Sequence, residues 1–181
     1  MNRLSQIDPN HTTTDRQALL QSINNAFGVV PNMFRTVAHA PAALNAMWGS
    51  FAALGKGKLG AKLGEQIAVA VANRNGCDYC LAAHTYIGQG AGLSREQLAL
   101  AQTGDSNDPR TRAALQFALE LTERRGQVGP DSVQNLRQHG FSDEEIVEIL
   151  AHVALNLFTN YTNIAFDVPV DFPGVALRKA A

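Results

Sequence analysis

The two cysteines of the chain lie three residues apart, and a histidine follows four residues after the second. They are Cys77, Cys80 and His84. In a helix of 3.6 residues per turn, this spacing puts all three side chains on one narrow face. Two thiols beside an imidazole are typical of a redox centre, or of most of a metal site.

Redox chemistry at such a site needs one thiol to ionise. A cysteine with an unperturbed pKa near 8.5 is only a few per cent thiolate at neutral pH. A helix beginning at Cys77 would supply partial positive charge, whereas His84 could take a proton from Cys80. The helix end therefore favours Cys77 as the more acidic thiol, and the base favours Cys80. The second cysteine could then close a disulfide and prevent irreversible over-oxidation.

Two helices must position this group. We expect the first over about 61–74 and the second from Cys77 or just after it, with a short connection at Asn75-Gly76. At about 1.5 Å per residue, Glu65 lies roughly 15 Å back from the turn and His84 roughly 12 Å forward. Glu65 can therefore reach the level of His84 and hold or relay its proton.

The rest of the chain also reads as helical. Ser94-Arg95-Glu96-Gln97 and Ser142-Asp143-Glu144-Glu145 are typical of capping boxes, and apolar residues recur at helical spacing from about Asp143 to Phe166. Strand-like alternation is nearly absent. The sequence predicts an all-α fold, a compact multi-helix bundle of about eight helices, with the CxxC motif at the N-terminus of a central helix.

Length and composition favour a single domain. The 181 residues are 45% apolar and 17% charged, with a net charge of −1. We expect a flexible N-terminal tail over 1–13, one helical domain over 14–167 and an extended C-terminal tail over 168–181. The charge gives little support for nucleic-acid binding, and no apolar run is long enough to span a membrane. Without an apolar signal segment, a cytoplasmic location is expected.

The pattern Glu65, eleven residues, Cys77-Asp78-Tyr79-Cys80, three residues and His84 resembles the active-site motif of the alkylhydroperoxidase D-like (AhpD-like) family, within the carboxymuconolactone decarboxylase superfamily. The flanking segments 66–72 and 80–84 are similar to it too, and the segment 151–161 resembles the peroxidase-related subgroup. The resemblance covers roughly residues 28–173.

The resemblance implies a helical fold assembled into a homo-oligomer, a trimer or hexamer, that reduces hydrogen peroxide or organic hydroperoxides. It implies that Cys80 attacks the peroxide, that Cys77 resolves the product and faces the reductant, and that Glu65 and His84 relay protons. An external dithiol or disulfide-reducing protein would be the partner, because no cofactor motif or metal is expected. The best-studied branch carries a histidine where Tyr79 stands, and a phenol is a poor base at neutral pH.

Other interpretations of the cysteines remain. A non-catalytic redox sensor or interaction module could use the same pair. A zinc-bound helical scaffold could use Cys77, Cys80, His84 and Glu65 as ligands. Two buried cysteines without chemistry are a third interpretation.

A polar stripe on the predicted long helix also requires an explanation. It consists of His152, Asn156, Asn160 and Asn163. We favour hydrogen bonds to buried backbone or across a subunit interface. The alternative is that the stripe lines the substrate channel, which makes His152 and Asn156, together with Tyr79, possible site-lining residues.

Overall fold

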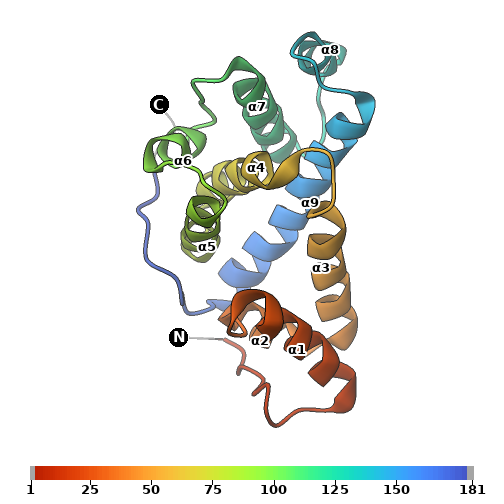
Figure 1. The fold of residues 1–181 in the computed structure, drawn as a ribbon, viewed down its shortest axis with the longest axis vertical. Helices are drawn as coiled ribbons and strands as arrows, with labels where there is room; N and C mark the ends of the chain where they lie inside the picture. Colours follow the sequence, from red (N-terminus) through yellow and green to blue (C-terminus); the bar gives the residue numbers. More distant parts are fainter. Residues whose placement is uncertain (1–2, 179–181) are drawn as a thin grey trace.

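The structure is a computed structural model that describes residues 3–178, which form nine α helices and no β strand (Figure 1). The all-α prediction is confirmed, with one helix more than the approximate count expected. The helices are α1 (Thr14–Phe27), α2 (Asn32–Val37), α3 (Pro41–Leu54), α4 (Gly60–Asn75), α5 (Asp78–Gly90), α6 (Arg95–Ala101), α7 (Pro109–Glu123), α8 (Pro130–Gln138) and α9 (Asp143–Phe166).

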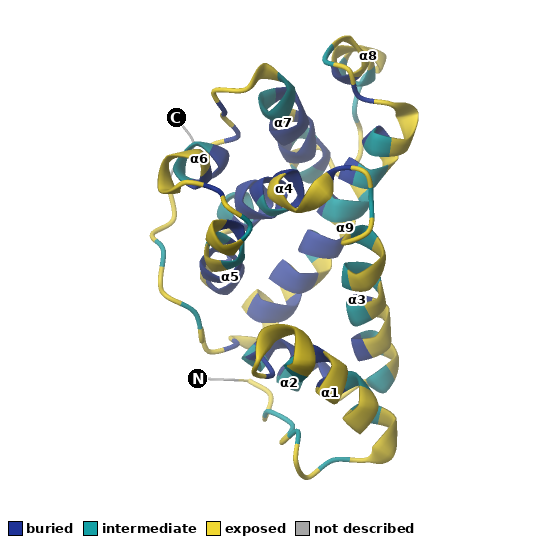
Figure 2. Ribbon diagram, viewed as in Figure 1, coloured by how far each residue is buried: buried dark blue, intermediate teal, exposed yellow. Residues whose placement is uncertain are grey.

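Helix α4 runs through the middle of the bundle, and α5, α6, α7 and α9 pack around it (Figure 1). It is buried on every side from Gln66 to Ala72, and most side chains in this run are small. Figure 2 shows the buried residues concentrated on α4, α5 and the inner face of α9, whereas α1 and α8 are largely exposed. Small side chains let the neighbouring helices approach α4 closely.

The turn between α4 and α5 reverses the chain at one glycine. Gly76 has φ 67° and ψ 34°, the left-handed conformation that ends many helices. The amide of Cys77 donates to the carbonyl of Ala72 at 3.0 Å, which closes the last turn of α4. Cys77 is then the N-cap of α5, and its Sγ accepts the backbone N–H of Cys80 at 3.3 Å. The predicted position of the CxxC motif is confirmed.

Helix α9 is the long helix that the sequence predicted. Its N-terminus carries the capping box of Ser142 and Glu145, in which each side chain accepts the other residue's backbone N–H. The face that carries Ile149, Val153 and Asn160 is buried in the bundle. The spacing of these residues therefore determines which face of α9 packs into the bundle and which face is left exposed.

Both end segments lie against the helices. The backbone N–H of Ile7 donates to the carbonyl of Arg35 at 3.1 Å, and that of Arg3 donates to Phe166 at 2.9 Å. Residues 168–178 contain no helix and run along the outside of α5 toward α6 (Figure 1), where the amide of Arg178 donates to Asn73. Residues 179–181 of the predicted extended tail lie outside the described residues. The flexibility of the first segment and the division into domains stay predictions.

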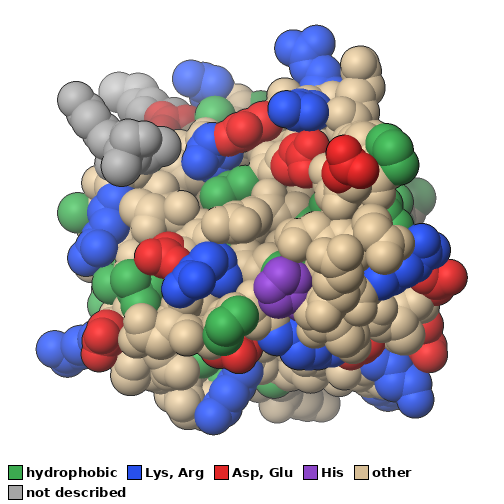
Figure 3. All heavy atoms as spheres, turned by 90° about the horizontal axis from the view of Figure 1, so that it is seen from above, with side chains coloured by type: hydrophobic (Ala, Val, Ile, Leu, Met, Phe, Trp, Pro, Cys, Tyr) green, Lys and Arg blue, Asp and Glu red, His purple; other side chains and the backbone are tan. Residues whose placement is uncertain are grey.

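Within residues 3–178, no helix combines the length and the apolar character that a membrane span requires. On the face drawn in Figure 3, basic and acidic side chains alternate without a patch of one sign. That face therefore offers no electrostatic footprint for a polyanion.

Candidate functional site: a cysteine pair beside a buried histidine

The fold brings together the four residues that the sequence singled out. Glu65 comes from α4, and Cys77, Cys80 and His84 come from the first turns of α5. His84 Nδ1 lies 2.9 Å from Glu65 Oε2, so the imidazole donates to the carboxylate and keeps Nε2 for another partner. Burial lowers the pKa of His84, but the adjacent Glu65 carboxylate outweighs it, so the net pKa is raised. The imidazolium form therefore persists to higher pH than usual.

Cys80 is the more acidic of the two thiols. Its side chain is buried, and burial alone would raise its pKa. Four neighbours outweigh burial: a hydrogen bond from Cys77, the positive charge of His84, and the amides of Asn163 and Asn160. Together they lower the pKa of Cys80 to about 7, from an ordinary value of 9.0.

The pKa of Cys77 moves in the opposite direction. Its hydrogen bond to Cys80 raises it first, and burial raises it further. The backbone N–H at the start of α5 works against this change but is too weak to reverse it. The structure therefore favours Cys80 as the more acidic thiol, as the base-proximity argument does, although the hydrogen bond from Cys77 lowers the pKa of Cys80 more than the charge of His84 does.

The two sulfurs line different cavities. Cys80 and His84 line a small apolar cavity of about 30 Å³, which also includes Met33, Tyr79 and Phe172. Cys77 lines a separate cavity of about 240 Å³ that it shares with Asn163. Each thiol could therefore meet a different reaction partner.

A third cavity lies beside the hydrogen-bonded pair of His84 and Glu65. It measures about 160 Å³, and His84, Glu65, His152 and Asn156 are among its lining residues. Burial lowers the pKa of His152. The amide of Asn156 donates to the His152 carbonyl at 2.9 Å, while its Oδ1 is buried without a hydrogen-bond partner. The two residues thus lie beside the Glu65 end of the site and away from the sulfurs, and their roles stay predictions.

Tyr79 lies between the two cysteines, and its side chain lines both of their cavities. Its hydroxyl accepts the backbone N–H of Met33 at 3.2 Å, and its ring packs edge-on against Phe172. Burial raises the pKa of the phenol, which stays neutral. Tyr79 therefore shapes the two cavities and holds the C-terminal segment, while the only imidazole of the cysteine motif is His84.

Asn160 and Asn163 complete the site; the sequence placed them on the polar stripe that was considered as a channel lining, but only His152 and Asn156 of that stripe were selected as candidate site residues. The Nδ2 of Asn163 donates to Cys80 Sγ at 3.1 Å, and the Oδ1 of Asn160 accepts from Asn75 at 2.9 Å. The sequence feature that could have identified them is their position on the same stripe of α9 as His152 and Asn156, the two candidate site-lining residues. The part of that stripe formed by Asn160 and Asn163 lies directly against Cys80.

The zinc interpretation gains no support from this geometry. Among the described residues, no three His, Cys, Asp or Glu side chains are grouped closely enough to hold a metal ion. Glu65 turns its carboxylate to His84, and Cys80 receives an amide from α9. These contacts suit a thiolate and a proton pair better than four ligands converging on one point.

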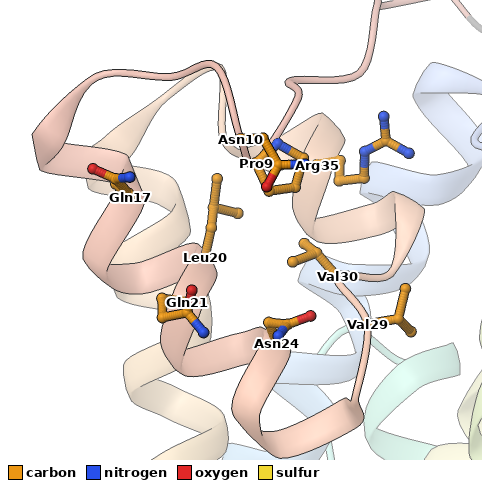
Figure 4. Close-up of a pocket in the computed structure, with 9 residues that line it drawn as sticks. All are labelled: Pro9, Asn10, Gln17, Leu20, Gln21, Asn24, Val29, Val30 and Arg35. Carbon is orange, nitrogen blue, oxygen red and sulfur yellow. The ribbon is translucent and has the colours of Figure 1, made fainter.

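A roomier cavity lies away from the cysteines, between α1 and α2 (Figure 4). It measures about 380 Å³, and Figure 4 shows side-chain amides of α1 facing Val30 and Arg35 across it. Arg35 already donates to the carbonyl of Ile7 and to Asn32. Without a nucleophile or a base in its lining, this cavity offers no comparable chemistry.

Comparisons with known proteins identify the family of the chain. The sequence profile described as the carboxymuconolactone decarboxylase family matches residues 38–120, which include all four motif residues. An uncharacterized protein of Cupriavidus necator is 40% identical over 88 residues, which are 48% of this chain and 73% of that protein.

Solved structures share the fold over nearly the whole chain. The alkylhydroperoxidase AhpD core of an uncharacterized peroxidase-related protein from Ralstonia eutropha JMP134 is 29% identical, with 93% of this chain and 92% of that chain covered and a TM-score of 0.82. A variant of the debrominase Bmp8, crystallised with 2,3,4-tribromopyrrole, is 23% identical, with coverage of 94% and 93% and a TM-score of 0.80, which shows the fold alone. On this evidence, the chain belongs to the carboxymuconolactone decarboxylase family and has the AhpD-like fold.

Proposed function

We propose that the protein is a thiol-dependent peroxidase that reduces hydrogen peroxide or organic hydroperoxides through Cys80 and Cys77. The observation that carries the proposal is the environment of Cys80. Its sulfur is buried and acidified, it lines a small apolar cavity, and the paired His84 and Glu65 lie beside it. Family members include proteins named as enzymes, and the Ralstonia eutropha relative is described as peroxidase-related.

The first half-reaction uses the Cys80 thiolate. The sulfur attacks the terminal oxygen of the hydroperoxide, an S–O bond forms and the O–O bond breaks. The departing alkoxide takes the proton that His84 holds and leaves as an alcohol, or as water when the substrate is hydrogen peroxide. A cavity of about 30 Å³ has room for the reacting O–OH end, so the remainder of an organic substrate would lie toward the surface.

The second half-reaction regenerates the thiols. The Cys77 sulfur attacks Sγ of the Cys80 sulfenic acid, an S–S bond forms, and hydroxide leaves as water with the proton from Cys77. An external dithiol then reduces the disulfide by exchange and is itself oxidised to a disulfide. The separate cavity at Cys77 offers that reductant a different approach from the one used by the peroxide.

Steady-state turnover tests the proposal. The reduced protein is mixed anaerobically with tert-butyl hydroperoxide and dithiothreitol, and peroxide loss is followed with time. We expect many turnovers per chain for the wild type and none for Cys80→Ser. One equivalent of peroxide consumed per chain, without turnover at any dithiol concentration, would instead indicate a redox sensor. Full activity in Cys80→Ser would show the site assignment to be wrong.

A further inference from the structure

One amide of α9 touches the sulfur of the site directly. Asn163 lies near the C-terminal end of α9, and its side chain is 4% exposed. Its Nδ2 donates to Cys80 Sγ at 3.1 Å, across 83 residues of sequence. The preceding amide of the stripe, Asn160, is fully buried and tied to Asn75 at 2.9 Å. The helix therefore presents a fixed pair of amides to the cysteine.

The oxygen of the Asn163 side-chain amide makes no compensating interaction. Its Oδ1 is buried and has no hydrogen-bond partner in the structure. An unpaired buried carbonyl is costly, and an apolar residue at this position would avoid that cost. The contact between Nδ2 and the sulfur is the compensating interaction, and it is strongest when the sulfur is ionised, because a charged acceptor strengthens a hydrogen bond.

We propose that Asn163 is a catalytic residue of the thiol site, whose side-chain amide stabilises the Cys80 thiolate by a direct hydrogen bond. The role as a step in peroxide reduction rests on the function proposed above. The ionisation effect itself can be measured without any peroxide.

The effect of Asn163 on the Cys80 pKa can be distinguished from the effects of the ionisable groups around the sulfur. Cys77 and His84 face the sulfur from α5, and Tyr79 adjoins it on the same helix; Glu65 acts from α4 through the imidazole. Helix α9 contributes amides, which do not titrate. The Asn163 contribution should therefore be constant with pH, whereas that of His84 disappears when the imidazole loses its proton.

The amide should also bias the thiol–disulfide equilibrium. In the disulfide, Cys80 Sγ carries no charge and accepts a hydrogen bond only weakly. Asn163 therefore stabilises the reduced form more than the oxidised form. Removing it should make the disulfide harder to reduce, and a tenfold change in the equilibrium with dithiothreitol corresponds to about 30 mV.

The test measures the ionisation of a single thiol. In a Cys77→Ser background, thiolate absorbance at 240 nm and the rate of iodoacetamide alkylation are followed against pH. Asn163→Leu should raise the pKa of Cys80 by about 1–2, because a hydrogen bond to a charged group is lost. Asn163→Asp has the same size, and once ionised it should raise that pKa further by placing a carboxylate beside the sulfur.

Thr162→Val is the matched control. Thr162 is a buried neighbour on the same helix, and its hydroxyl donates to the Phe158 carbonyl at 2.8 Å without reaching the sulfur. Thr162→Val removes one buried side-chain hydrogen bond of α9 and should leave the titration midpoint of Cys80 unchanged. An Asn163→Leu protein that folds and titrates like its parent would overturn the proposal; if that variant does not fold, the same result in Asn163→Asp would do so. If the wild type showed no peroxidase turnover but Asn163→Leu still raised the pKa of Cys80, the proposed enzyme function would be refuted. The role of the Asn163 amide in stabilising the thiolate would then stand.

Discussion

The two thiols lie one helical turn apart, yet their acidities move in opposite directions. The pKa of Cys80 is lowered to about 7 and that of Cys77 is raised. The difference arises from which sulfur receives donors and positive charge. Cys80 receives them from Cys77, His84 and α9, whereas Cys77 donates its S–H in the hydrogen bond to Cys80 and therefore keeps its proton to higher pH. This difference supports the proposal that Cys80 attacks the peroxide and Cys77 resolves the product.

The rate of thiolate reaction should follow the Cys80 ionisation. Because the pKa is lowered, the reactive anion predominates above about pH 7 and is lost below it, so iodoacetamide alkylation should rise with pH through that value. His84→Ala removes the nearby positive charge, so the midpoint should move toward the ordinary 9.0. At pH 7 the peroxide reaction should slow by about 10²–10⁴-fold, the usual size of general acid–base help.

Glu65→Gln serves as the companion variant, because it removes the charge that keeps the imidazole protonated while retaining its size. It should lower the peroxide rate in the same direction and shift the profile less. Alkaline pH should restore alkylation in both variants, but not the full peroxide rate, because the leaving group still lacks its proton donor. If both variants showed the wild-type pH profile, the proposed proton relay by Glu65 and His84 would be excluded.

Cys77→Ser should separate attack from resolution. Cys80 stays reactive, so the variant should consume at most one hydroperoxide per chain and then stop as a sulfenic acid. Intact-protein mass spectrometry after a single addition should show one added oxygen, and excess peroxide should drive further oxidation. Sustained turnover in this variant would mean that Cys77 is not the resolving thiol.

The residue-scale site was predictable only where local spacing determines it. Glu65 and His84 lie on two helices joined by a short turn, so counting residues from Gly76 was enough to bring them level. Asn163 reaches Cys80 from 83 residues away. Its contact depends on how α9 is rotated against the bundle, which a periodic pattern describes only as a buried face.

At the scale of elements, the turn at Gly76 determines the geometry of the site. It ends α4 and makes Cys77 the N-cap of α5. The positive φ of 67° is costly for any residue with a Cβ, although Cβ-sized space is open there. The strain, not a clash, is the reason to keep glycine at this position.

Gly76→Ala should therefore destabilise the fold by about 1–2 kcal/mol, and Gly76→Asn by less, because asparagine tolerates this conformation. Urea denaturation of the reduced proteins would measure the difference. Gly90→Ala is the control, since Gly90 is helical, exposed and open around its Cα. That variant should be neutral or more stable by up to about 1 kcal/mol. Equal losses in Gly76→Ala and Gly90→Ala would contradict the strain argument.

Element boundaries were predictable to the extent that side chains mark them. The serine caps at Ser94 and Ser142 and the length of α9 are confirmed, because a cap and a stripe are both local signals. The placement of residues 168–178 was not predictable, because a segment without helical or strand periodicity does not indicate which surface of the protein it packs against. Phe172 packing on Tyr79 is visible only in three dimensions.

At the scale of the whole molecule, α9 has a second apolar stripe that the described chain does not cover. Val147, Leu150, Phe158 and Tyr161 are exposed at spacings of three to eight residues, on the side opposite the buried stripe. Exposed apolar residues in one continuous row on a helix favour contact with another surface. The homo-oligomer expected from the family resemblance would use this stripe, and each copy's α9 would then be buried on both faces.

We therefore expect the protein to be larger than a monomer in solution, and Leu150→Glu combined with Tyr161→Glu to shift it to monomers, because each change places a charge in the proposed contact. Multi-angle light scattering during size exclusion measures the mass directly. Gln134→Glu, on the exposed surface of α8, adds a charge elsewhere and should leave the mass unchanged. Because Asn163 lies on the buried face of the same helix, monomers should also react more slowly at Cys80 if assembly holds α9 in place. A wild-type monomer at micromolar concentration would exclude the interface.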